Sequence, residues 1–145
     1  MSRFPFSSTG SLIVRPASAG TLVLALTGGE RPQPVSQQLA QADGHYAAGQ
    51  FDMAAAAYGR IAAKDASSYG AVLGLARVAM LRNDLPEAGT RLKQALALKP
   101  LEREPQALMG ELHYRRNEFA AAAPFFEAVG QKAKAEKMRA FEGRS

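Results

Sequence analysis

The chain has no cysteine, and its 145 residues include only two histidines. The lack of cysteine excludes a disulfide scaffold, thiolate catalysis and thiolate metal sites. No run of about 18 apolar residues occurs, which excludes a protein with several membrane-spanning helices. With 47% hydrophobic and 21% charged residues, the composition is that of one folded domain and not of a collagen-like or disordered chain.

The positive charge is not concentrated in any one part of the chain. The net charge of +5 divides into +2 over residues 1–34, +1 over 35–102 and +2 over 103–145. A mild basic cluster near the end comprises Lys132, Lys134, Lys137 and Arg139. A nucleic-acid-binding surface needs a basic stripe on one face, so we expect a solvated surface and no nucleic-acid partner.

Residues 1–34 differ in composition from the rest of the chain. They combine basic residues, a short apolar run over Thr21–Leu26, small residues and a polar, proline-rich exit. This order resembles an export signal. If residues 1–29 act as one, the mature chain begins near Glu30 and the protein is periplasmic or secreted. The alternatives are a disordered tail, which leaves the protein cytoplasmic, or a loose pair of strands.

A period of 34 residues relates three segments that follow Pro34. Shifting the sequence by this period places Ala54, Ala88 and Ala122 in one column, without a gap from residue 35 to residue 129. A second column of small residues holds Ala42, Ala76 and Gly110. Columns of larger residues hold Phe51, Leu85 and Phe119; Tyr58, Leu92 and Phe126; and Ile61, Ala95 and Val129. The two small columns predict close contacts between paired helices.

The turn between the paired helices has its own column, Gly49, Asn83 and Asn117. These residue types tolerate the left-handed conformation that ends a helix. Asp84 then offers an N-cap, with a capping-box carboxylate at Glu87. First helices are predicted over 36–48, 69–82 and 104–116. Second helices are predicted over 51–64, 85–98 and 118–129.

A 34-residue period with small and aromatic residues at these positions resembles the tetratricopeptide repeat (TPR). The resemblance covers three repeats, 35–68, 69–102 and 103–136, and implies an all-α TPR solenoid of three helix-turn-helix repeats. Pro124 falls inside the last of these helices, where we expect a kink. We expect residues 131–141 to form a C-terminal capping helix. The TPR domain then spans 35–141, after an N-terminal segment 1–34 and before a tail, 142–145.

The sequence offers no catalytic constellation. It contains no nucleophile elbow, phosphate-binding loop or dinucleotide-binding loop. His45 and His113 occupy the same column two hairpins apart, roughly 20 Å if each hairpin advances by a helix diameter, so they cannot share a metal ion. We expect each to be a packing histidine bonded locally. The prediction is therefore no enzyme, no cofactor and no metal site.

The resemblance implies a binding surface, because the first helices of TPR arrays line a concave groove. The positions carried over by column are Leu39, Asp43, Tyr46, Leu73, Arg77, Met80, Leu81, Glu111, Tyr114 and Arg115. Together they form an apolar floor with alternating charges, which suits an extended peptide or a partner helix. The expected role is a scaffold for protein–protein interaction. Asp43 would repel a terminal carboxylate at the first repeat.

Two further hypotheses remain open. The segments Leu75–Leu85, Tyr114–Asn117 and Lys137–Arg144 resemble the N-terminal TPR region of exported bacterial retropepsin-like aspartic proteases. No aspartate of this chain begins the Asp-Thr/Ser-Gly loop that such a protease needs, so the chain would be a docking or self-association arm. The third hypothesis is a homo-oligomer in which the uncovered hairpin face stacks on a second copy.

Overall fold

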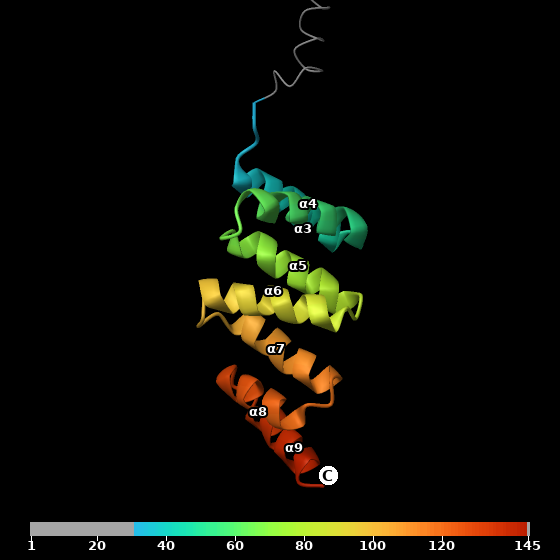
Figure 1. Ribbon diagram of the computed structural model, residues 1–145, viewed down its shortest axis with the longest axis vertical. Coiled ribbons are helices and arrows are strands. Elements are labelled where there is room, and N and C mark those ends of the chain that lie inside the picture. The colour runs from blue at the N-terminus through green and yellow to red at the C-terminus, as the bar shows by residue number, and fades with distance from the viewer. Residues whose placement is uncertain (1–30, 145) are drawn as a thin grey trace, which may run out of the picture. The chain divides into compact units, whose positions relative to one another are not determined.

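The computed structural model describes residues 31–144, and over this range the chain forms helices and no strand. The seven helices are α3 (Val35–Ala47), α4 (Phe51–Lys64), α5 (Tyr69–Leu81), α6 (Leu85–Leu98), α7 (Arg103–Arg115), α8 (Phe119–Ala128) and α9 (Lys132–Glu142). Each helix packs against the next one along the chain (Figure 1). The predicted all-α stack of three hairpins and a capping helix is confirmed. The proposed export signal, residues 1–29, lies outside the described residues.

Left-handed residues end the first helix of each hairpin, as predicted. The φ angles are +76° at Gly49, +58° at Asn83 and +62° at Asn117. In each case the second helix begins two residues later. Asp84 caps α6 by accepting a hydrogen bond from the Glu87 backbone N–H at 3.3 Å. The Glu87 carboxylate was predicted to complete a capping box at this helix start. It instead accepts a 2.6 Å hydrogen bond from Arg91 Nε, one turn later in α6.

The alanine columns form equivalent contacts in the three hairpins. Ala54, Ala88 and Ala122 all have no exposed surface. The residues of the second small column, Ala42, Ala76 and Gly110, are also buried. The larger residues one helical turn further along the second helices, Tyr58, Leu92 and Phe126, are at most 1% exposed. Small side chains therefore let paired helices approach, and the large ones fill the space between neighbouring helices.

The third hairpin departs from the other two in its second helix. α8 has 10 residues, whereas α4 and α6 each have 14. It continues through Pro124 to Ala128, and Gly130, at a φ of +82°, then turns the chain into α9. Ala135 and Met138 of α9 complete a buried cluster with α8. The capping helix thus covers the apolar face that the last hairpin would otherwise expose.

None of the helices in the described part of the chain combines the length and the apolar character needed to cross a membrane.

Candidate binding groove

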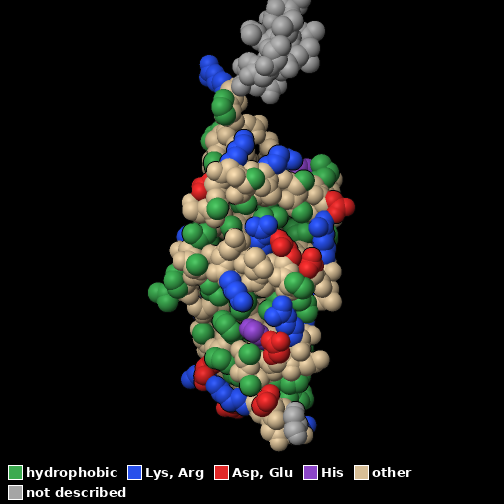
Figure 2. Space-filling view, in the orientation of Figure 1, with side chains coloured by type: hydrophobic (Ala, Val, Ile, Leu, Met, Phe, Trp, Pro, Cys, Tyr) green, Lys and Arg blue, Asp and Glu red, His purple; other side chains and the backbone are tan. Residues whose placement is uncertain are grey.

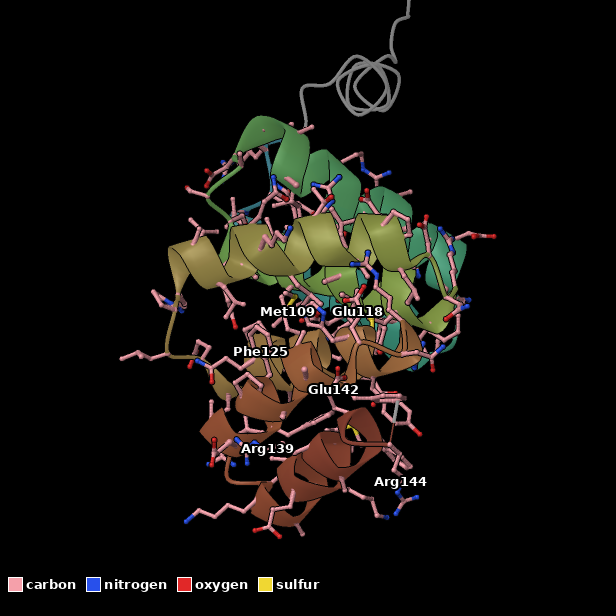
Figure 3. The ribbon with its side chains drawn as sticks, turned by 60° about the horizontal axis from the view of Figure 1, so that its bottom comes forward. Met109, Glu118, Phe125, Arg139, Glu142 and Arg144 are labelled. Carbon is pink, nitrogen blue, oxygen red and sulfur yellow. The ribbon has the colours of Figure 1, made fainter. Side chains whose placement is uncertain are left out.

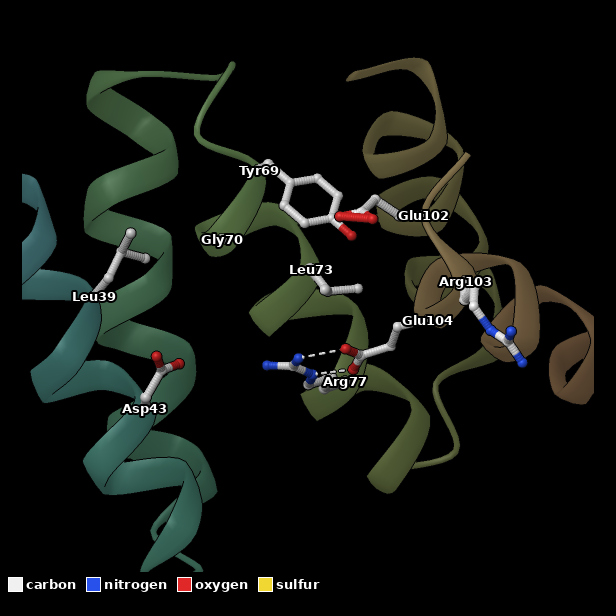
Figure 4. A pocket seen from close by; sticks show the side chains of 9 residues that line it. All are labelled: Leu39, Asp43, Tyr69, Gly70, Leu73, Arg77, Glu102, Arg103 and Glu104. Carbon is white, nitrogen blue, oxygen red and sulfur yellow. Dashed lines mark hydrogen bonds and ion pairs between the residues drawn. The ribbon is translucent and has the colours of Figure 1, made fainter. Parts of the chain in front are cut away.

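The first helices α3, α5 and α7 line two adjoining hollows. The larger, which we call the N-terminal hollow, has a volume of about 470 Å³. It is lined by Leu39, Asp43, Tyr69, Gly70, Leu73, Arg77, Glu102, Arg103 and Glu104 (Figure 4). The smaller, the central hollow, has a volume of about 210 Å³. It is lined by Tyr46, Arg77, Met80, Leu81, Glu104, Leu108, Glu111 and Arg115.

The floor of both hollows is apolar. Leu73 and Met80 are each 4% exposed and belong to the core between the second and third hairpins. Leu39 lies over Gly70, where a β-carbon would come within 3.2 Å of the leucine methyl groups. The absence of a side chain at Gly70 thus lets α3 and α5 approach, and a larger residue there would displace Leu39.

An ion pair between Arg77 and Glu104 separates the two hollows. Arg77 Nε donates to Glu104 Oε1 at 2.5 Å, and Arg77 Nη2 donates to Oε2 at 2.7 Å (Figure 4). These hydrogen bonds raise the pKa of the Arg77 guanidinium, so it stays charged. The pair links α5 to α7 and places one fixed charge of each sign in the middle of the groove.

Asp43 is held from behind by Tyr58. The Tyr58 hydroxyl donates to Asp43 Oδ1, and the tyrosine ring is fully buried. Burial raises the pKa of Tyr58 well above its ordinary value, and the hydrogen bond to Asp43 adds to the effect. The carboxylate of Asp43 therefore lies on the wall of the N-terminal hollow with one oxygen already bonded, and it gives that wall a negative charge.

Arg115 joins α7 to the end of α5. Its Nη1 donates to the Met80 carbonyl at 2.7 Å, and its Nε donates to Glu111 at 3.2 Å. A guanidinium at the carboxyl end of a helix is favourable because the last carbonyls have no helical partner. The neighbouring Leu81 is 53% exposed, so the central hollow offers an apolar side chain next to an ordered charged pair.

Nine of the ten predicted groove residues therefore line the two hollows, and Tyr114 is the exception. Tyr114 lies in a separate pocket of about 400 Å³ between α7 and α9, which we call the end pocket. The end pocket is lined by Tyr114, Ala133, Lys134, Lys137, Met138 and Phe141. The 34-residue period relates only positions within the three repeats, so it could not place Tyr114 against α9.

Several residues that line the two hollows were not predicted from the sequence. Gly70 and Glu104 occupy the second position of their repeats, which is a groove position in the family that the sequence resembles. Both could have been predicted as groove residues from the 34-residue period. Tyr69, Glu102, Arg103 and Leu108 lie outside those positions, and no sequence signal marked them.

The two histidines are bonded locally, as predicted. His45 Nδ1 lies 2.7 Å from Gln50 Oε1, and His113 Nδ1 lies 2.7 Å from Glu118 Oε1, which makes the contacts equivalent two repeats apart. The His113 ring also stacks on Phe125 of α8. Among residues 31–144, no group of three or more histidine or acidic side chains is arranged to hold a metal ion.

Basic and acidic side chains are interspersed over the face seen in Figure 2. Among the described residues, Arg82 pairs with Asp52 and Arg139 pairs with Glu127, each between neighbouring helices. Pairs of this kind on an exposed surface contribute little to stability.

Comparison with known proteins supports the repeat assignment. Residues 45–112 match the model of the tetratricopeptide repeat family. These residues run from the end of α3 into α7, so they include the second hairpin in full. No curated protein matches the chain. The seven consecutively packed helices between residues 31 and 144 have the fold of an all-α TPR solenoid. Together with this fold, the match supports the assignment of the chain as a tetratricopeptide repeat protein.

Proposed function

We propose that the protein is a non-catalytic scaffold that binds an extended peptide or a partner helix along α3, α5 and α7. One observation carries the proposal. Nine of the ten side chains predicted as groove residues, from three helices, line two adjoining hollows that share Arg77 and Glu104. Grooves that combine an apolar floor with a few ordered charged groups suit peptide recognition.

The groove favours a ligand that alternates apolar and charged side chains. Leu39 and Leu73 offer apolar contact in the N-terminal hollow, and Leu81 offers it in the central hollow. Asp43 and the Arg77–Glu104 pair are held in place by hydrogen bonds before any ligand arrives. Charged groups that are already ordered cost little conformational entropy on binding, so they can fix the register of a peptide.

A selection experiment with matched variants tests the groove. Peptides are selected from a displayed random library on the full chain, and their affinities are then measured for Leu81→Asp and Met53→Asp. The two side chains have nearly equal exposure, 53% and 52%, but Met53 lies on α4 outside both hollows. Loss of apolar contact and an added charge at Leu81 should weaken binding about tenfold or more. Equal effects of the two substitutions would place the binding site elsewhere.

A docking or self-association arm is the second candidate. The three segments that resemble the TPR region of retropepsin-like proteases include the carboxyl ends of α5, α7 and α9. Arg115 bonds to Met80 between the ends of α7 and α5, and Tyr114 shares the end pocket with Phe141 between the ends of α7 and α9. Sedimentation velocity over a range of concentrations tests self-association. A rising sedimentation coefficient supports it, and a monomer at every concentration contradicts it.

A further inference from the structure

The end pocket has an apolar floor and aromatic walls. Met138 lies beneath it at 2% exposure, whereas Tyr114 and Phe141 are 41% and 38% exposed. Both rings pack against Phe119, with centroid separations of 5.9 Å for Tyr114 and 5.2 Å for Phe141. The walls are therefore supported from behind by a third ring, and the pocket can receive an apolar side chain without rearrangement.

The polar groups around the end pocket can all donate hydrogen bonds. They are the ammonium groups of Lys134 and Lys137 and the hydroxyl of Tyr114, and no Asp, Glu, Asn or Gln is among the lining residues. The ammonium of Lys134 lies 4.4 Å from the Phe126 ring centroid and 3.9 Å from Glu111 Oε2. Lys137 makes no ion pair with any residue in the described range. The pocket thus carries positive charge that the protein only partly compensates.

Two arginines of the groove, in contrast to Lys137, are paired with carboxylates. Arg77 is paired with Glu104, and Arg115 is paired with Glu111. Elsewhere on α9, Arg139 is paired with Glu127 at 2.8 Å, and Arg144 lies over the Phe141 ring at the end of the helix (Figure 3). The end pocket therefore combines an apolar floor with a lysine that has no ion pair among the described residues, and two lysines do not form the stripe that a nucleic acid needs.

We propose that the end pocket binds a carboxylate attached to a bulky apolar group, as presented by an acidic peptide next to a leucine-like side chain. The apolar group would lie between the rings of Tyr114 and Phe141, and the carboxylate would accept from Lys137 and Lys134. A volume of about 400 Å³ falls within the range of small-ligand pockets, about 300–1,000 Å³. This site goes beyond the groove proposed above and does not depend on it.

Two small probes that differ in one group test the proposal. The uniformly ¹⁵N-labelled full chain is titrated with N-acetyl-leucine, which carries a carboxylate, and with N-acetyl-leucinamide, which is its neutral analogue. The acid should shift the amide resonances of Tyr114 and of residues 133–141 in a saturable manner. The amide should bind about threefold to fivefold more weakly, the range expected for one solvent-exposed ion pair.

Matched lysine variants separate a defined site from general attraction. Lys137→Gln should weaken binding of the acid by about the same three- to fivefold factor. Lys132→Gln removes an equal charge from the same helix, but Lys132 does not line the pocket, so it should leave the affinity unchanged. Both substitutions are at exposed positions, and identical thermal melts by circular dichroism check that both variants are folded.

Four outcomes would overturn the proposal. The first two are the absence of any shift at residues 133–141 and equal affinities for the acid and the amide. The third is an equal loss of affinity for the acid in both lysine variants. The fourth is that a thymidine oligonucleotide shifts the same resonances more strongly than the acid does. A failure of this kind leaves the proposed groove untouched, because the groove is tested with different ligands, the selected peptides, and with different variants, Leu81→Asp and Met53→Asp.

Discussion

The ring of Tyr58 on α4 occupies the space that a side chain at Gly74 on α5 would need. A β-carbon built at Gly74 would overlap with the ring atoms of Tyr58, whose side chain has no exposed surface. Tyr58 thereby joins the first hairpin to the second while its hydroxyl holds Asp43 on the groove wall. The packing between repeats and the charge of the groove thus depend on the same residue.

Gly74→Ala should destabilise the fold. The new methyl group would force the buried Tyr58 ring to move, and overpacking of this kind costs about 1–3 kcal/mol. Gly59→Ala is the matched control, because Gly59 also lies inside a helix and a β-carbon there meets nothing within 4 Å. That control should gain up to about 1 kcal/mol from helix propensity. Urea denaturation measures both, and a stabilised Gly74→Ala variant would contradict this packing.

The turn at Asn117 should tolerate glycine and reject alanine. Its φ of +62° is left-handed, and that conformation costs an ordinary residue with a β-carbon about 1–2 kcal/mol. Asn117→Ala should therefore lower the free energy of unfolding by about 1 kcal/mol, whereas Asn117→Gly should change it little. Chemical denaturation of both variants provides the comparison. If the two variants prove equally stable, the turn does not have the described conformation.

The Arg77–Glu104 pair should show a measurable coupling energy in an alanine double-mutant cycle. The side chains are 30% and 48% exposed, so solvent screening limits the coupling to about 1 kcal/mol at most. The coupling should decrease in high salt. A parallel cycle on Arg91 and Glu87, a pair within α6, should give a smaller value because its geometry is a single contact. The absence of coupling at low salt would contradict the two-bond geometry.

Tyr58 should ionise only when the protein unfolds. Its folded pKa is raised, chiefly by burial and then by the hydrogen bond to Asp43. A raised pKa means that this group stabilises the fold fully below the unfolded value, about 10, and that the contribution is lost as the pH rises above it. Absorbance at 295 nm should therefore show one of the four tyrosines titrating together with loss of helical circular dichroism. Tyr58→Phe should remove that step.

If all the tyrosines of the wild-type chain ionise while the helical signal is intact, Tyr58 is accessible to solvent and the wall beneath Asp43 is not packed as described.

Much of the fold could be predicted from the sequence because the 34-residue period constrains every repeat in the same way. The ends of the three first helices and of α4, α6 and α8 lie within one residue of the predicted ends. Gly49, Asn83 and Asn117 mark the turns by their backbone conformation. Small residues that recur at one position of the repeat indicate where paired helices approach each other. The close helix contacts at Ala54, Ala88 and Ala122 could therefore be predicted from the sequence.

The capping helix was predicted at residues 131–141, but the surroundings of Tyr114 could not be predicted from the 34-residue period, because the chain departs from that period after α8. α9 begins at Lys132, earlier than a fourth repeat in register would start, since α8 is short and Gly130 turns the chain. This shift places Tyr114 in the end pocket and not in the groove. Pairings such as Arg77 with Glu104 depend on side-chain reach between repeats, which columns of residue types do not encode.

The central claim is that α3, α5 and α7 form one binding groove. Its most direct test is to titrate the ¹⁵N-labelled full chain with a peptide selected on it and to map the shifted amide resonances. We expect the largest shifts on groove residues of all three helices, among them Leu39, Arg77 and Leu108. Shifts confined to α4, α6 and α8 would contradict it.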